Sequence, residues 1–100
     1  MGNCCKNPSD SRQVADLAEI LKVISEPNRL KILCLLKSGT KCVCEIQRSL
    51  KLNQNLVSHH LKVLRDAELI ESEKLCQWKH YSLSTKTLTK YATIFNKLLT

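Results

Sequence analysis

Apolar residues recur at helical spacing through the first third of the chain. Within residues 10–24 they stand three or four positions apart with charged residues between them, which predicts an amphipathic helix. Ser25 and Pro27 interrupt it, because proline disfavours helix at the preceding residue and suits a first helical turn. From Leu30 to Leu36 apolar residues fall on nearly every face, which predicts a central helix in which Cys34 packs as a small hydrophobic residue.

Two short helices are expected next, at residues 43–50 and 54–66. Thr40 is a weak candidate to cap the first, and Asn53 can cap the second. The second helix carries an apolar stripe made of Val57, Leu61 and Leu64. Two short helices joined by a tight turn form a helix-turn-helix, although this turn lacks its frequent glycine.

The pattern changes period after Ala67. Residues 69–75 and 78–83 show partial alternation with aromatic and branched side chains and bracket Cys76 and Gln77, which predicts a β-hairpin. Residues 84–100 return to helical spacing. The expected fold is mainly α with a β-hairpin, in the order α-α-α-α-β-β-α of a winged helix-turn-helix. Residues 1–9 are expected to form a flexible arm and residues 10–100 the domain.

The charge of the chain indicates which class of partner it binds. The chain has 100 residues, enough for one domain, and its 16 Lys and Arg against 9 Asp and Glu give a net charge of +7. A small basic domain attracts polyanions, with nucleic acid as the first candidate. No run of about 18 apolar residues is present, so no membrane partner is expected.

The polar face of the 54–66 helix is the candidate DNA-reading surface. Asn and Gln can pair with adenine, and Lys neutralises phosphate. The alternative is an ordinary solvated face; the basic helix-turn-helix favours DNA. His60 lies near the apolar stripe, so a buried, hydrogen-bonded role is expected for it. The candidate contacts to operator double-stranded DNA are Gln54, Asn55, Ser58, His59 and Lys62, with Lys74 and Lys79 of the hairpin against neighbouring phosphates.

Six cysteines without a signal segment indicate a reducing cytoplasm, where clustered thiols are more often metal ligands or redox groups than disulfides. Cys42 and Cys44 would point about 200° apart inside a regular helix, so they can share an ion only in its half-formed first turn. A helix N-terminus also favours thiolate. The alternative is that both cysteines simply pack there.

Two ligands rarely suffice for a soft ion. Cys4 and Cys5 on the arm can supply a third and a fourth thiolate, from the same chain or from a partner. Three sulfurs suit trivalent arsenic or antimony, and four suit cadmium, lead or zinc. Adjacent cysteines are hard to use together on one ion, which favours three ligands. Cys76 in the hairpin turn is expected to take no part.

The chain resembles the ArsR/SmtB family of metal-sensing repressors over about residues 17–83. The resemblance is carried by residues 26–33 (Glu-Pro-Asn-Arg-Leu-Lys-Ile-Leu), 42–46 (Cys-Val-Cys-Glu-Ile), 58–64 (Ser-His-His-Leu-Lys-Val-Leu) and 81–83 (Tyr-Ser-Leu). It implies a homodimeric winged helix that represses a detoxification operon and leaves its operator when an ion binds. The cysteine pair implies the arsenic, antimony, cadmium or lead branch.

Departures from the family pattern limit what the resemblance implies. Arsenic sensors of the best-known pattern carry a further cysteine where this chain has Gln47, so the remaining ligand must come from elsewhere. Cadmium and lead sensors recruit cysteines from an N-terminal arm, which Cys4 and Cys5 resemble. The zinc-sensing branch uses Asp, His and Glu on the last helix, and residues 84–100 contain none of these.

The sequence also bears on assembly and on alternative functions. The amphipathic helices at residues 10–24 and 84–99 are expected to form a two-fold homodimer interface, because so small a domain struggles to cover both apolar stripes. Alternatives to the sensor are a thiol redox switch between Cys42 or Cys44 and the arm, and a structural zinc clip. No motif supports an enzyme with a Cys–His pair.

Overall fold

The computed structural model describes residues 8–100, with side chains from residue 11 onward. The elements are α1 (Pro8–Ile24), α2 (Pro27–Leu36), β1 (Lys41–Cys42), α3 (Val43–Leu50), α4 (Gln54–Asp66), β2 (Ile70–Leu75), β3 (Trp78–Leu83) and α5 (Thr85–Leu99). This order confirms the expected winged helix-turn-helix and adds one strand, β1. A two-residue strand has no alternation to detect. α1 begins at Pro8, slightly earlier than the helix expected from residue 10.

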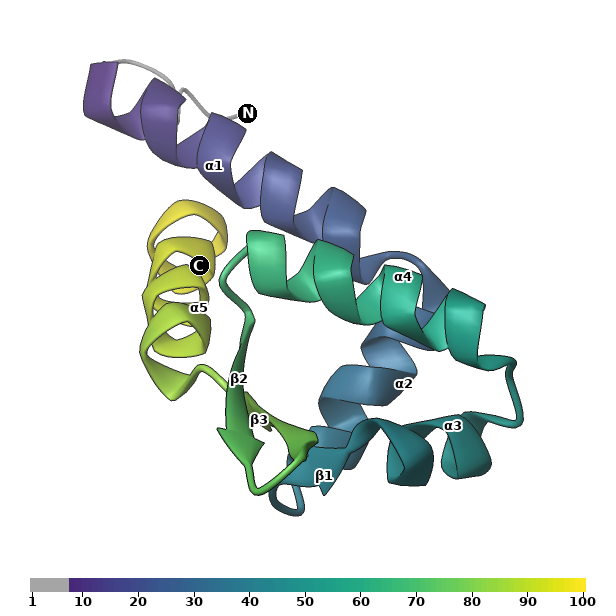
Figure 1. Cartoon of the computed structure of the whole chain (residues 1–100). Coiled ribbons are helices and arrows are strands. Elements are labelled where there is room, and N and C mark those ends of the chain that lie inside the picture. The colour runs from purple at the N-terminus through teal and green to yellow at the C-terminus, as the bar shows by residue number, and fades with distance from the viewer. Residues whose placement is uncertain (1–7) are drawn as a thin grey trace.

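The three strands form one antiparallel sheet in the order β1-β3-β2. The hairpin β2–β3 is the wing, and Figure 1 shows it beside α2 and the start of α3. β1 pairs with β3 through Lys41 opposite Tyr81 and Cys42 opposite His80. The wing is therefore hydrogen-bonded to the segment that opens the helix-turn-helix.

The core lies where α2, α3, α4 and the sheet meet. Its most deeply buried side chains are Ile32, Ile46, Val57, Leu61, Leu64 and Leu69. α2 is central as expected, since Ile32, Leu33 and Leu36 are buried. Leu30 and Cys34 are exposed, so the expectation that Cys34 packs inside is wrong. The protein covers only one side of α2, although the helix is apolar on nearly all faces.

Local polar contacts define the ends of the helix-turn-helix. Cys42, in extended conformation, is the N-cap of α3, so the expectation of Thr40 in that role is wrong. α3 ends at Leu50, and its C-cap Lys51 has a left-handed φ of 56°, which makes the turn without a glycine. Asn53 caps α4 as expected, because its Oδ1 accepts a hydrogen bond from the Leu56 N–H at 2.8 Å.

The corner between α1 and α2 is fixed by side chains that the pattern does not reveal. Glu26 caps α2 by accepting the Asn28 N–H at 2.6 Å, and Arg29 Nε donates to the Val23 carbonyl at 2.8 Å. α1 then runs past the body of the molecule with α5 beside it (Figure 1). Within residues 8–100, no helix is long and apolar enough to cross a membrane.

Candidate nucleic-acid interface and cysteine site

A groove separates the outer face of α4 from strand β3 of the wing. Gln54, Ser58, Lys62 and Arg65 line its α4 side, and Lys79 lines its wing side. These α4 residues share a face because intervals of four, four and three residues return a helix to nearly the same angle. The structure thus brings together four of the predicted DNA-contacting residues, Gln54, Ser58, Lys62 and Lys79.

Arg65 is a member of this surface that the sequence reasoning missed. It stands three residues after Lys62, so extending the polar stripe by one more turn would have found it. Among the described residues, the side chains that line the groove include three cations, counting Arg65, and no carboxylate. The Lys62 ammonium lies 3.1 Å from Asp66 on the exposed surface, which modestly offsets its charge.

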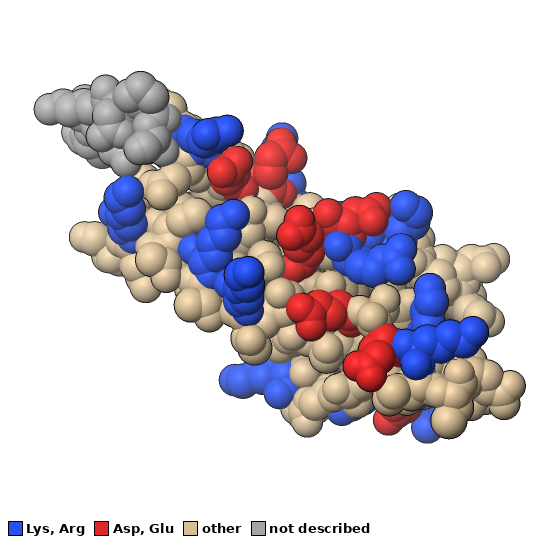
Figure 2. Space-filling view, turned by 60° about the vertical axis from the view of Figure 1, so that its left-hand side comes forward, with Lys and Arg blue, Asp and Glu red and all other residues tan. Residues whose placement is uncertain are grey.

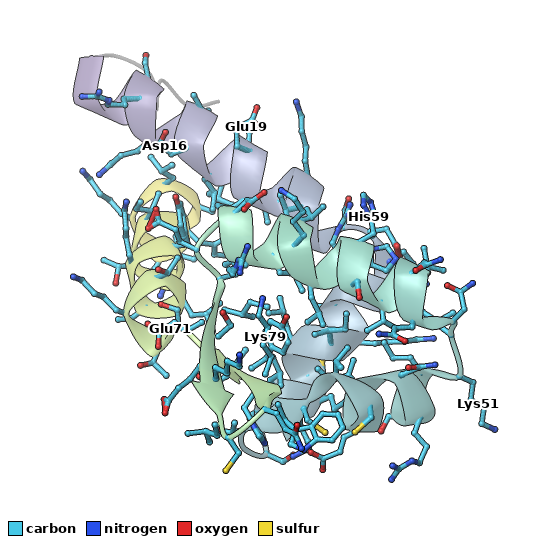
Figure 3. All side chains as sticks on the ribbon, viewed as in Figure 1. Asp16, Glu19, Lys51, His59, Glu71 and Lys79 are labelled. Carbon is cyan, nitrogen blue, oxygen red and sulfur yellow. The ribbon has the colours of Figure 1, made fainter. Side chains whose placement is uncertain are left out.

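Three other predicted contacts lie outside the groove. Asn55 and His59 are exposed on α4, and Figure 3 shows His59 on the side of α4 away from the wing. Lys74 stands directly opposite Lys79 in the β2–β3 register. Their contact with DNA stays a prediction.

Acidic side chains gather outside the groove. Asp16 and Glu19 of α1 line a shallow hollow together with Asp66 and Glu68 at the end of α4. Figure 2 shows one face of the molecule on which carboxylates lie between lysines and arginines. The positive surplus of the chain is therefore uneven, and the groove between α4 and β3 is the better place for a polyanion.

His60 is buried as expected, and it links α4 to the start of α2. Its Nε2 lies 3.3 Å from Glu26 Oε2, and its side chain is only 6% exposed. Burial lowers the pKa of His60, while the Glu26 carboxylate opposes that shift and Arg29 and His59 add to it. The imidazole is thus neutral near pH 7 and can donate Nε2–H to Glu26.

We expect the stability of the protein to fall as pH drops below about 6.5, where the unfolded histidine takes up a proton. The lowered pKa means that the folded state binds this proton only at lower pH, so stability is lost as pH falls through the folded pKa. Urea unfolding between pH 7.5 and 5 measures the slope. His60→Gln should flatten it, whereas His59→Gln on the exposed face should not. Equal slopes for wild type and His60→Gln would contradict this assignment.

Cys42 and Cys44 converge at the entry to α3, as the half-formed turn predicts. Their sulfur atoms lie 2.7 Å apart, because Cys42 is still extended while Cys44 is already helical. The Glu45 carboxylate accepts the Cys42 backbone N–H at 3.0 Å and holds this turn. Cys34 and Cys76 are free and exposed, on α2 and in the wing turn.

The expected thiolate at the helix N-terminus does not hold for Cys42. Its hydrogen bond with the Cys44 thiol raises the pKa of Cys42, and the Glu45 backbone N–H opposes this only in part. The neighbouring Cys44 thiol stabilises the protonated form of Cys42 and outweighs the helix N-terminus. Binding of an ion must therefore release protons from the pair.

The Cys42 and Cys44 sulfurs suit a soft ion, but they supply only part of the ligands that such an ion needs. Two sulfurs bound tetrahedrally at about 2.3 Å from one ion stand roughly 3.8 Å apart, so the two thiols would have to open by about 1 Å. Among residues 8–100, no group of three Cys, His, Asp or Glu is already arranged around an ion position. The predicted ligands Cys4 and Cys5 lie outside the described residues.

Comparison with known proteins places the chain in a family. Residues 26–72 match the family described as "Bacterial regulatory protein, arsR family". The "Arsenical resistance operon repressor" of Staphylococcus xylosus is 40% identical over 73 residues, which span 73% of this chain and 70% of that protein. The "Transcriptional repressor SdpR" of Bacillus subtilis is 39% identical over 69 residues, spanning 69% of this chain and 77% of that protein.

Solved structures of other proteins share the fold. The structure of reduced HlyU from Vibrio cholerae superposes with a TM-score of 0.76 at 27% identity, over 94% of this chain and 100% of that one. One relative is named for arsenic resistance and another for repression alone, so family membership leaves the effector open. From the sequence match, the shared fold and the helix-turn-helix with its wing, the chain belongs to the ArsR/SmtB family of winged-helix transcriptional repressors.

Proposed function

We propose that this repressor binds operator DNA as a homodimer and leaves it when a soft, thiophilic ion binds Cys42 and Cys44. The observation that carries the proposal is the 2.7 Å approach of the two sulfurs at the N-terminus of α3. Trivalent arsenic or antimony is the proposed effector, with Cys4 or Cys5 as the third thiolate. A cadmium or lead sensor with the same cysteines is the alternative within this family.

DNA binding rests on the groove between α4 and β3. In a helix-turn-helix the second helix enters the major groove, and its N-terminal residues approach the base edges. Gln54 and Ser58 occupy that part of α4, so they are assigned to bases. Lys62, Arg65 and Lys79 surround them with positive charge and are assigned to phosphates. Asn55, His59 and Lys74 lie outside the groove and are assigned to further contacts with the DNA.

The homodimer rests on an apolar hollow between α1 and α5. It is lined by side chains such as Leu17, Leu21, Leu88 and Phe95, and Leu21 and Phe95 are each about two-fifths exposed. Leu99 at the end of α5 is 61% exposed. A second copy of this surface would cover these side chains and set two α4 helices for neighbouring half-sites.

Phe95→Glu should convert the dimer to a monomer, because it places a charge in the centre of an apolar interface. Sedimentation equilibrium would give the mass, and operator affinity should fall when dimerisation is lost. Thr93→Glu, an equal charge at an exposed position of α5, is the control. A dimer that persists in Phe95→Glu would show that α1 and α5 are not the interface.

Coupling between the cysteines and DNA follows from three roles of Cys42. It is the N-cap of α3, it belongs to β1, and β1 pairs with the wing strand β3. A bound ion supplies a fixed spacing between the sulfurs that the free pair does not have. When Cys42 and Cys44 move apart, α3 and β3 must shift against each other, and the groove between α4 and β3 changes shape. Affinity for DNA falls only as far as the free form binds the ion better.

A thiol redox switch is the second candidate, and the same short sulfur–sulfur distance favours it. A peroxide could take two electrons and two protons from a pair of thiols, leaving a disulfide and water. Cys42 or Cys44 would pair with each other or with Cys4 or Cys5. Release from DNA by peroxide without any ion, and reversal by a dithiol, would identify this mechanism.

Operator affinity with and without the ion tests the proposal. The operator can be isolated by selection from random duplex DNA, and fluorescence anisotropy at fixed salt then gives Kd. Arsenite should raise Kd by about 5- to 150-fold, the usual range of allosteric coupling. Cadmium, lead and peroxide are parallel arms. Unchanged Kd in every arm would reject the sensor and leave the DNA-binding role intact.

A further inference from the structure

The neighbour of Cys42 across the sheet is a histidine. In the antiparallel pair β1–β3, Cys42 stands directly opposite His80. Side chains of directly opposed residues project from the same face of a sheet, with Cβ atoms about 4.5–5.5 Å apart. A nitrogen donor thus stands beside the cysteine pair on a different element of the described chain.

His80 has a ring nitrogen without a protein partner. Its Nδ1 is enclosed, and among the described residues it makes no hydrogen bond. An enclosed polar atom of this kind is destabilising unless something binds it, so it calls for a ligand or a water. Neutral imidazole nitrogen is the commonest protein ligand for metal ions.

The strand register adds a third residue beside Cys42 and His80. Glu73 of β2 stands opposite His80 on its other side, so Cys42, His80 and Glu73 cross the sheet in one line. Tyr81 and Lys41 form the next line and project from the opposite face, where Tyr81 is buried. A metal-bound histidine is usually oriented by a carboxylate on its other nitrogen, and Glu73 is placed for that role.

We infer that His80 is a third ligand of the cysteine site, binding through Nδ1 a divalent ion that Cys42 and Cys44 hold. The inference rests on the proposed cysteine site and deepens it. Two sulfurs and one imidazole nitrogen suit divalent ions such as zinc or cadmium, whereas trivalent arsenic needs a third sulfur. The cysteine pair can then serve two classes of ion, depending on whether a cysteine of the arm or His80 completes it.

This ligand would also explain how the wing takes part. His80 and Lys79 are neighbours in β3, and Lys79 lines the groove assigned to DNA. The three donors are not yet arranged around one position among residues 8–100, so the cysteine side chains must turn toward β3. That movement draws α3 and the wing together through Cys42 and His80.

Cadmium titration of the full, reduced chain tests the ligand set. Ultraviolet sulfur-to-cadmium absorption measures binding, and side-chain 15N NMR of histidine reports which nitrogen binds. His80→Ala should weaken cadmium binding by at least about 10- to 100-fold, the loss seen even for groups that only support a ligand. His59→Ala, which removes an exposed imidazole, should bind as wild type does. His80→Cys should restore affinity and increase the sulfur absorption.

The outcomes separate this inference from the proposed function. A shift of His80 Nδ1 on adding cadmium to wild type supports it even if His80→Ala fails to fold. Cadmium affinity that is unchanged in His80→Ala, together with His80 signals of the wild-type protein that do not move when cadmium is added, overturns the inference. If Cys42→Ser still weakens cadmium binding, the cysteine site stands. Should Cys42→Ser also bind as wild type, the proposed cysteine site itself fails. A Cys4→Ser/Cys5→Ser variant that loses cadmium while His80→Ala keeps it would also overturn the inference.

Discussion

Gln54→Ala should weaken binding to the operator by about 5- to 150-fold per half-site, because a bidentate contact to a base contributes roughly 1–3 kcal/mol of discrimination. Gln54 is exposed at the N-terminal end of α4 and lines the groove facing the wing. Binding to random-sequence DNA should change little, since that affinity depends on phosphate contacts. Anisotropy titrations with operator and random duplexes at one salt concentration give both values.

The lysines give the contrasting pattern and serve as internal controls. Lys79→Ala should weaken binding to operator and random DNA alike and reduce the salt slope by about one. Lys86→Ala removes the same charge from α5, away from the groove, and should leave both affinities nearly unchanged. An equal loss on both DNAs for Gln54→Ala would contradict its assignment to a base.

Replacing Cys42 and Cys44 together by serine should abolish the response to the ion and leave DNA binding in its absence unchanged. Serine is close to cysteine in size and can cap α3, but it removes the soft donor, so a coupling of about 5- to 150-fold should fall to none. The Glu45 carboxylate would still accept the backbone N–H of residue 42 and hold the turn. Kd for the operator with and without arsenite is the measurement.

Two other thiols of the described chain provide matched controls. Cys34→Ser on α2 and Cys76→Ser in the wing turn change the same atom at exposed positions outside the pair. Both variants should respond to the ion as wild type does. A response that survives in the Cys42/Cys44 variant, or disappears in Cys34→Ser, would place the effector site elsewhere.

Most of the scaffold could be predicted because its signals are local. Helical spacing predicted α4, and Asn53 indicated where it begins, because a short polar side chain satisfies a free N–H group of a first helical turn. Alternation and aromatic residues placed the wing. β1 escaped because two residues carry no period, and its pairing with β3 depends on residues about 40 positions away.

The wrong predictions for Cys34, Thr40 and the Cys42 thiolate share one cause. Each depends on which residues come into contact in the folded chain, and local sequence patterns do not give those contacts. Apolar residues on all faces of α2 do not reveal which face is covered, so Cys34 was misplaced. A cysteine is an unusual cap, so Thr40 was expected instead of Cys42. The role of the helix N-terminus was correct in direction, but the Cys44 thiol outweighs it for the pKa of Cys42.

The candidate site was predicted in parts rather than as a whole. The sequence indicated the convergence of Cys42 and Cys44 and the polar face of α4, because both follow from helical geometry. Arg65 continues the same polar face and could have been predicted in the same way. The link from His60 to Glu26 required the folded chain. The register that puts His80 beside Cys42 could not be read either, since strand pairing depends on the whole domain.

Reciprocal linkage gives the most direct test of the central claim, that ion binding at Cys42 and Cys44 and DNA binding oppose each other. Arsenite, and cadmium in a parallel series, is titrated into the free protein and into its operator complex at one pH and salt concentration. We predict weaker ion binding in the complex, by the same factor by which the ion weakens DNA binding. Equal ion affinity of the free protein and the complex would contradict the claim.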